Sequence, residues 1–83
     1  MHHLGNIREK IGGDRLPMAV QDFSLVLKLD ANYAPAYNGR GLVLDRLGNY
    51  QDAIADFSKA VKLDNLNAVY WHNRACCYRN CAM

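Results

Sequence analysis

The stretch AIADFSKAVKLD (residues 53–64) repeats an earlier stretch of the chain, AVQDFSLVLKLD (residues 19–30), with seven of the twelve positions identical. The first stretch begins at position 19 and the second at position 53, an offset of 34 in the sequence. The same offset relates APAYNGRGLVL (residues 34–44) to AVYWHNRACCY (residues 68–78). Two different segments that recur at one period indicate a chain built from structural repeats.

The spacing of small and apolar residues within these segments predicts helices. In residues 35–47, Tyr37, Gly41, Leu44 and Leu47 recur at four-then-three spacing, which places them on one face of a helix. The other segments have similar apolar stripes. We therefore expect helices over residues 16–29, 35–47, 50–63 and 68–80.

Helix boundaries are marked by residues with special backbone properties. Pro35 suits a first helical turn, where its missing N–H is not needed. Gly48 favours a helix end, and Asn49 is a preferred N-cap residue for the helix that follows. Because the link at 48–49 is so short, the helices on either side of it should be antiparallel neighbours.

The chain resembles the tetratricopeptide repeat family, whose helix–turn–helix units recur every ~34 residues with the pattern W-x2-L-G-x2-Y, A-x3-F and P. Residues 34–67 match this pattern as Tyr37-x2-Arg40-Gly41-x2-Leu44 and Ala53-x3-Phe57. Residues 68–83 match its first half as Trp71-x2-Arg74-Ala75-x2-Tyr78, and residues 14–33 match its second half through Ala19-x3-Phe23. The resemblance implies an all-α fold of four to five helices, stacked as antiparallel hairpins in a short right-handed solenoid.

The resemblance also implies one domain over residues 1–83, with about one full repeat (34–67) and two half repeats (14–33 and 68–83). Residues 1–13 are either irregular or a short helix, since they carry none of the aromatic positions of a first helix. The proline of the family pattern is replaced by Ala31 and Asn65, so we expect loose turns between repeats.

Two charged residues recur with the repeat and suggest ion pairs between helices. Arginine replaces the leucine of the family pattern at Arg40 and Arg74, and an aspartate recurs at Asp22 and Asp56. A charge on the inner face of a helix requires a partner. We expect Asp22 to pair with Arg40 and Asp56 to pair with Arg74; the alternative is that all four side chains face solvent.

The last segment has the composition of a metal or redox site, but its spacing argues against one. His72 and Cys76 are four residues apart, as are Cys77 and Cys81, which puts each pair on one face of a helix. The two pairs lie about 100° apart around that helix, so they cannot share one ion. We expect no metal site, small-residue filler roles for Cys76 and Cys77, and the most exposed thiol at Cys81.

Other functional classes lack support in the sequence. Ser24 and Ser58 recur because the repeat recurs, no phosphate-binding glycine loop is present, and His72 has no acidic neighbour within one helical turn. We therefore expect no enzyme activity and no cofactor. A net charge of +2 without a basic run argues against a nucleic-acid partner, and the absence of a long apolar run argues against a membrane partner. The N-terminal residues do not resemble a secretory signal, so an intracellular, cytoplasmic location is expected.

The resemblance implies that the first helix of each repeat lines a groove that holds an extended peptide or a partner helix. The positions that it places in this groove are Asn38, Leu42, Asp45, His72, Asn73, Cys76 and Arg79. The pattern of lysine and asparagine with which some members of the family hold a C-terminal carboxylate is mostly missing.

An incomplete set of repeats leaves an apolar helix face uncovered. The chain is therefore expected to be a fragment or short form of a longer array, a homodimer or higher oligomer, or both. Trp71 and Tyr78 are the residues expected at the contact. The leading functional hypothesis is a non-catalytic protein-interaction scaffold; the alternatives are a self-assembling structural element and a regulatory fragment of a larger enzyme.

Overall fold

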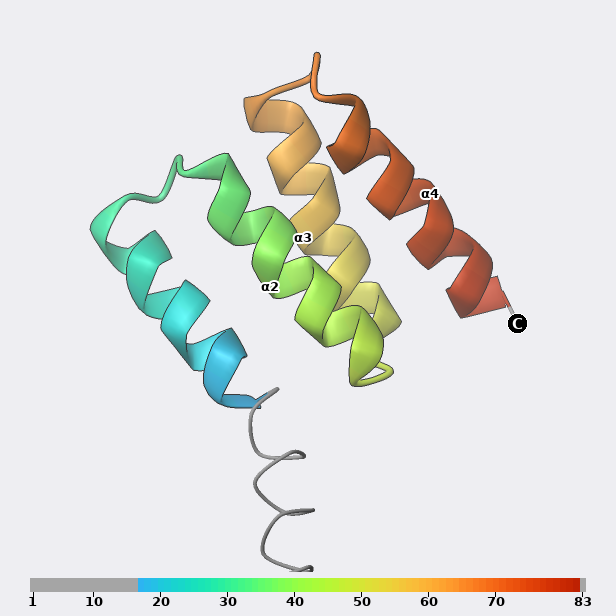
Figure 1. Cartoon of the computed structure of the whole chain (residues 1–83), viewed down its shortest axis with the longest axis horizontal. Coiled ribbons are helices and arrows are strands. Elements are labelled where there is room, and N and C mark those ends of the chain that lie inside the picture. The colour runs from blue at the N-terminus through green and yellow to red at the C-terminus, as the bar shows by residue number, and fades with distance from the viewer. Residues whose placement is uncertain (1–16, 83) are drawn as a thin grey trace, which may run out of the picture.

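The fold was analysed in a computed structural model, which describes residues 17–82 (Figure 1). A first helix covers residues 17–29 and is followed by α2 (Ala34–Arg46), α3 (Tyr50–Leu63) and α4 (Ala68–Ala82). No strand occurs in this part of the chain. The predicted all-α class and the four predicted helices are confirmed, with boundaries that differ only slightly from the expected ones. Residues 1–13, for which a short helix was one of two expectations, lie outside the described residues.

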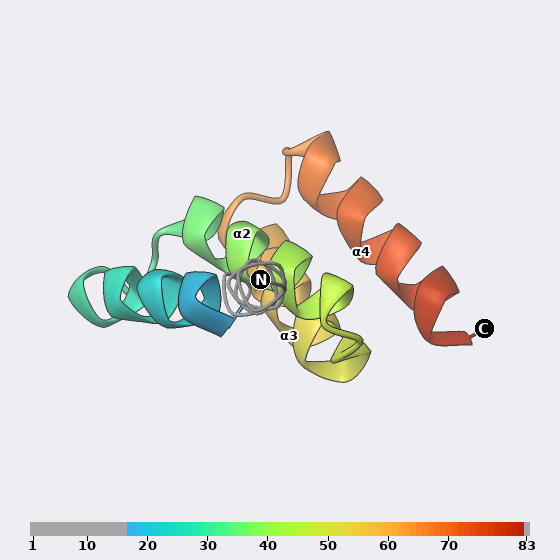
Figure 2. The same cartoon turned by 60° about the horizontal axis from the view of Figure 1, so that its bottom comes forward.

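The helices form consecutive antiparallel neighbours that lie side by side (Figures 1 and 2). The α2–α3 hairpin is central, with helix 17–29 on one side and α4 on the other (Figure 2). The hairpin turns at Gly48, whose φ of +84° lies in the region that glycine adopts without strain. Pro35 occupies the first turn of α2, as predicted. Asn49 holds the N-cap position of α3, but its side chain makes no capping hydrogen bond.

Phe57 is the largest fully buried side chain among residues 17–82. It is fully buried, together with Ala53 of α3 and Cys77 of α4. Its ring lies against Gly41, where an added Cβ would come within 2.8 Å of it. The small residue of the repeat pattern therefore lets α2 approach the aromatic ring of α3. Cys77 fills a small-residue position on the other side, as the sequence suggested.

A second buried cluster joins the same three helices at the other end of the hairpin. It consists of Ala34, Ala60, Val61 and Tyr70, with Tyr37 and Leu63 packed against it. The two clusters lie between α3 and its neighbours α2 and α4. The core thus follows the apolar stripes predicted from the sequence.

Each turn between repeats accepts a hydrogen bond from an aromatic side chain of the helix that follows it. The Tyr37 hydroxyl donates to the carbonyl of Ala31 at 2.9 Å, and the Trp71 indole N–H donates to the carbonyl of Asn65 at 2.8 Å. The second bond repeats the first at the offset of the sequence repeat. The aromatic residue of each repeat therefore contacts the turn in which the family proline is missing.

We predict that Phe57→Ala will lower the free energy of unfolding by about 3–5 kcal/mol, because the substitution leaves a cavity against Gly41 and Cys77. A domain of this size has a total stability of only about 4–12 kcal/mol, so chemical denaturation should show a large loss. Leu66→Ala is the control, since Leu66 is 91% exposed and its removal should change stability by less than about 0.5 kcal/mol. Equal losses for the two variants would contradict the assigned core.

Candidate functional site

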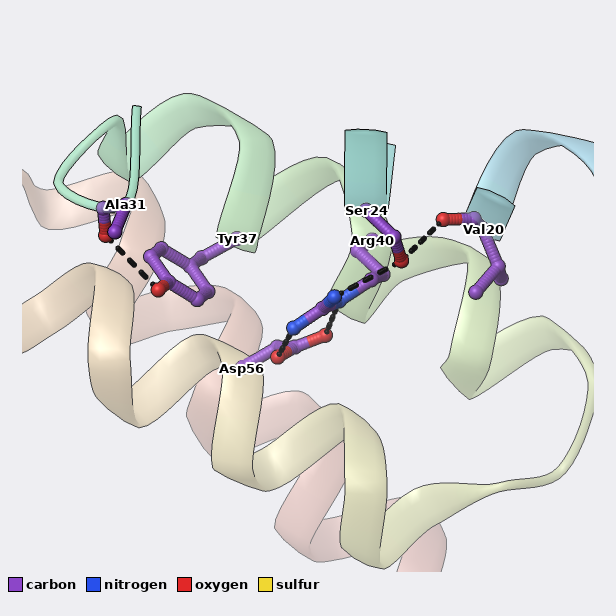
Figure 3. Close-up of polar contacts among 6 residues, drawn as sticks. All are labelled: Val20, Ser24, Ala31, Tyr37, Arg40 and Asp56. Carbon is purple, nitrogen blue, oxygen red and sulfur yellow. Dashed lines mark hydrogen bonds and ion pairs between the residues drawn. The ribbon is translucent and has the colours of Figure 1, made fainter. Parts of the chain in front are cut away.

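Arg40 is the centre of a polar network that links three helices (Figure 3). Its Nε and Nη2 atoms donate to the two carboxylate oxygens of Asp56 at 2.7 and 2.8 Å. Its Nη1 atom donates to Ser24 Oγ at 3.0 Å, and Ser24 in turn donates to the carbonyl of Val20 at 2.8 Å. Asp56 lies on α3 and Ser24 on helix 17–29, so a single guanidinium on α2 connects the central hairpin to the preceding helix.

The predicted partners of these charges are wrong. Arg40 binds Asp56 within its own repeat rather than Asp22, and Asp56 is therefore not bound to Arg74. The reason is geometric: a residue near the middle of α2 faces α3 across the hairpin turn, and Asp56 is 6% exposed on the facing side. The hydrogen bond with Asp56 raises the pKa of Arg40, an effect that the partial burial of Arg40 opposes.

Asp56→Ala should therefore destabilise the chain by about 2 kcal/mol, since it leaves the half-buried Arg40 guanidinium without its carboxylate. Asp22→Ala removes the same group from the equivalent position of the preceding repeat, where the carboxylate is exposed. This control should change the free energy of unfolding by less than about 0.5 kcal/mol in urea titrations. If Asp22→Ala lowered the free energy of unfolding as much as Asp56→Ala, the predicted pairing of Asp22 with Arg40 would be supported instead.

An open hollow of about 300 Å³ lies beside this network. Its lining consists of Val20, Arg40, Leu44, Asp52, Ala55 and Asp56. Two of its three charged groups, Arg40 and Asp56, already bind each other, and the third, Asp52, is exposed to solvent. None of the predicted groove residues lines this hollow.

The residues predicted to line the groove come from α2 and α4, and one pair of them makes a hydrogen bond from one helix to the other. Asn73 Nδ2 donates to Asn38 Oδ1 at 2.8 Å, which joins α4 to α2. Further along the same two helices, Asn80 Nδ2 lies 3.3 Å from Asp45 Oδ1. Leu42 of α2 is 41% exposed. Asn80 was not among the predicted residues, although its separation from Asp45 in the sequence equals that between Asn38 and Asn73.

The remaining predicted residues form a short row on α4. His72 Nε2 lies 3.4 Å from Cys76 Sγ, and Arg79 Nη2 donates to the same sulfur at 3.5 Å. We call the seven predicted residues the α2–α4 face. They are Asn38, Leu42 and Asp45 of α2 with His72, Asn73, Cys76 and Arg79 of α4. Among residues 17–82, no three side chains of His, Cys, Asp or Glu lie close enough together to hold a metal ion.

The three thiols differ sharply in their surroundings. Cys81 is exposed, Cys76 is half-buried and Cys77 is fully buried, with its Sγ 3.6 Å from the carbonyl of Tyr50. Burial, with a smaller contribution from the negative charge of Asp45, raises the pKa of the Cys77 thiol to about 11. Cys81 is thus the most exposed thiol, as predicted.

A thiol reagent at pH 8 should label Cys81 first, Cys76 more slowly and Cys77 only after unfolding, as mass spectrometry of labelled peptides would show. Folded Cys77 keeps its proton up to a pH of about 11, whereas an ordinary thiol loses it near 9.0. Because the folded chain binds this proton more tightly than the unfolded chain, the protonated Cys77 thiol stabilises the fold below pH 9. This stabilisation is lost as the pH rises towards 11. Rapid labelling of Cys77 in the folded chain would contradict its placement in the core.

Helix hairpins of this length, stacked at a regular sequence period and built on a small residue facing an aromatic ring, define a helical-repeat protein. The family comparison agrees: residues 34–65 match the model of the tetratricopeptide repeat. The chain thus carries a repeat of the tetratricopeptide type, which generally serves as a non-catalytic module for protein–protein interaction.

A curated relative supports the same family. The chain is 33% identical over 60 residues to the DnaJ homolog subfamily C member 7 homolog of Dictyostelium discoideum. The matched region covers 72% of the chain but only 11% of the relative. Within residues 17–82, the helices are too short or too polar to cross a lipid bilayer.

Proposed function

We propose that the chain is a non-catalytic interaction module that binds an extended peptide of a partner protein on the α2–α4 face. The observation that carries the proposal is the contact between Asn38 and Asn73. It places two side-chain amides from different repeats next to each other on one surface. Their mutual hydrogen bond fixes both amides in position.

The two amides complement a peptide backbone. Asn38 contributes its Oδ1 atom to the contact and Asn73 contributes its Nδ2 atom, which leaves the N–H donors of Asn38 and the carbonyl acceptor of Asn73. Neither of these groups has another partner among residues 17–82. The free N–H groups of Asn38 can donate to a carbonyl of an extended peptide. The free carbonyl of Asn73 can accept from a neighbouring peptide N–H.

The surroundings of the amides favour a ligand without strong net charge. Asp45 and Arg79 contribute one charge of each sign, and the exposed Leu42 provides an apolar contact. A highly acidic or basic peptide would gain little from such a surface. We therefore propose a roughly neutral segment, with an apolar side chain over Leu42 and its backbone held by the asparagines. The alternative occupant is a partner helix, which could use Leu42 but not the backbone pairing.

Selection from a displayed library of random peptides against the immobilised chain would test this proposal. Selected synthetic peptides should bind Asn73→Ala at least about tenfold more weakly than the parent chain in fluorescence anisotropy, because one backbone partner is lost. Gln51→Ala is the matched control, since it removes an exposed side-chain amide from α3 and should leave affinity unchanged. Circular dichroism would show that both variants keep their helices. Selected peptides that bind the three chains equally would contradict the proposed site.

A further inference from the structure

Two pairs of polar side chains connect α2 and α4, and the second pair differs in chemistry from the first. Asn38 is bound to Asn73, whereas the two carboxylate oxygens of Asp45 lie 3.3 and 3.4 Å from Asn80 Nδ2. The residues of each pair are 35 positions apart in the sequence. Asp45 therefore follows Asn38 along α2 by the same number of residues as Asn80 follows Asn73 along α4.

The two pairs lie on the same side of their helices. Asp45 follows Asn38 by seven residues, which is close to two full helical turns and a distance of ~10 Å along the helix axis. The exposed Leu42 lies between them on α2. Three residues of an extended peptide also span ~10 Å. A peptide held at the first pair therefore reaches the second pair with the residue three positions away.

The Asp45 carboxylate has no cation as a partner in the described part of the chain. It is half-buried, and its hydrogen-bond donor there is the neutral amide of Asn80. After burial, its negative charge is the next cause of the raised pKa of Cys77. Among the described residues, neither Arg46 nor Arg79 lies within ion-pair distance of this carboxylate, although each is next to a member of the pair in the sequence. Most of the acceptor capacity of the carboxylate therefore stays available.

The second pair offers acceptors, whereas the first pair offers a donor and an acceptor. Asn80 contributes an N–H group to its contact with Asp45, which leaves its amide carbonyl oxygen for a further contact. A carboxylate and a carbonyl oxygen side by side match the several N–H donors of an ammonium or guanidinium group. Hydrogen bonds between such a cation and a carboxylate are stronger than those between neutral groups. The side chain that fits this position of a ligand is therefore lysine or arginine.

We propose that the peptide on the α2–α4 face carries one lysine or arginine, whose side chain binds Asp45 together with Asn80. This residue lies about three positions from the one whose backbone binds Asn38 and Asn73, with the apolar residue over Leu42 between them. The inference rests on the proposed function, because it assigns a side chain to one position of the same peptide. A single basic residue leaves that segment nearly neutral.

The peptides selected on the parent chain should share one lysine or arginine at a fixed distance from an apolar residue. One such peptide, blocked at both ends so that its termini carry no charge, is compared by fluorescence anisotropy with a version in which glutamine replaces the basic residue. The glutamine peptide should bind the parent chain at least about tenfold more weakly. This difference should shrink at high salt, because it arises from an exposed charge pair.

Asp45→Asn separates the role of the charge from that of the fold. The substitution keeps the shape of the side chain and an oxygen for Asn80, but it removes the negative charge. The variant should bind the basic peptide at least about tenfold more weakly than the parent chain does, and it should bind the glutamine peptide like the parent chain. Asp52→Asn is the matched control, since it removes a carboxylate from an exposed position on α3 and should leave both affinities unchanged.

Failure of this inference is distinguishable from failure of the proposed function. Selected peptides without a shared basic residue, or equal binding of the basic peptide to Asp45→Asn and the parent chain, would overturn the role of Asp45. The same holds if Asp45→Asn weakens the basic and glutamine peptides by one factor. In each case the proposed function stands if Asn73→Ala still weakens binding. Absence of any peptide binding, or binding unchanged by Asn73→Ala, would overturn both.

Discussion

The bidentate ion pair between Arg40 and Asp56 is the interaction on which the arrangement of the described helices depends. The guanidinium lies on the inner side of α2, where it is partly removed from water and requires a carboxylate. Asp56 supplies the carboxylate from α3, and Ser24 accepts the remaining hydrogen bond from helix 17–29. The pair therefore fixes the register of the central hairpin and attaches the preceding helix to it. Phe57 packs into Gly41 within this register, so the polar and apolar contacts are satisfied together.

The repeat substitutes one kind of interaction for another while keeping the geometry. Arginine stands in for a leucine, and a hydrogen bond from an aromatic side chain to a turn carbonyl stands in for the conformational restriction of proline. Tyr37 and Trp71 perform the second role in successive repeats, although one donates through a phenol and the other through an indole. The two repeats share the position of a hydrogen-bond donor near the start of the first helix. The spacing of the repeat is therefore kept although one donor is a tyrosine and the other a tryptophan.

Helix α4 carries two groups of polar side chains with different surroundings. The α2–α4 face has paired amides, one charge of each sign and a single exposed leucine, which are properties of a surface for a peptide backbone. Away from this face, the guanidinium of Arg74 lies over the ring of Trp71 and within hydrogen-bond distance of Ser58 on α3. The α4 residues of the α2–α4 face and those around Arg74 are thus different residues of the same helix.

The sequence by itself determined the elements of this protein. The offset between its repeated segments predicted the four helices, the Gly48 turn, and the positions of Gly41 and Phe57 in the core. These features follow from the spacing of apolar and small residues along the chain, which can be read from a single sequence. Only the tertiary structure decided which side chains bind each other. A repeated Arg and Asp allow pairing within a repeat or between repeats, and only the facing of α2 and α3 across their turn selects Arg40 with Asp56. The same holds for Asn38 and Asn73, whose contact depends on how closely α4 approaches α2, a distance that no spacing in the sequence specifies.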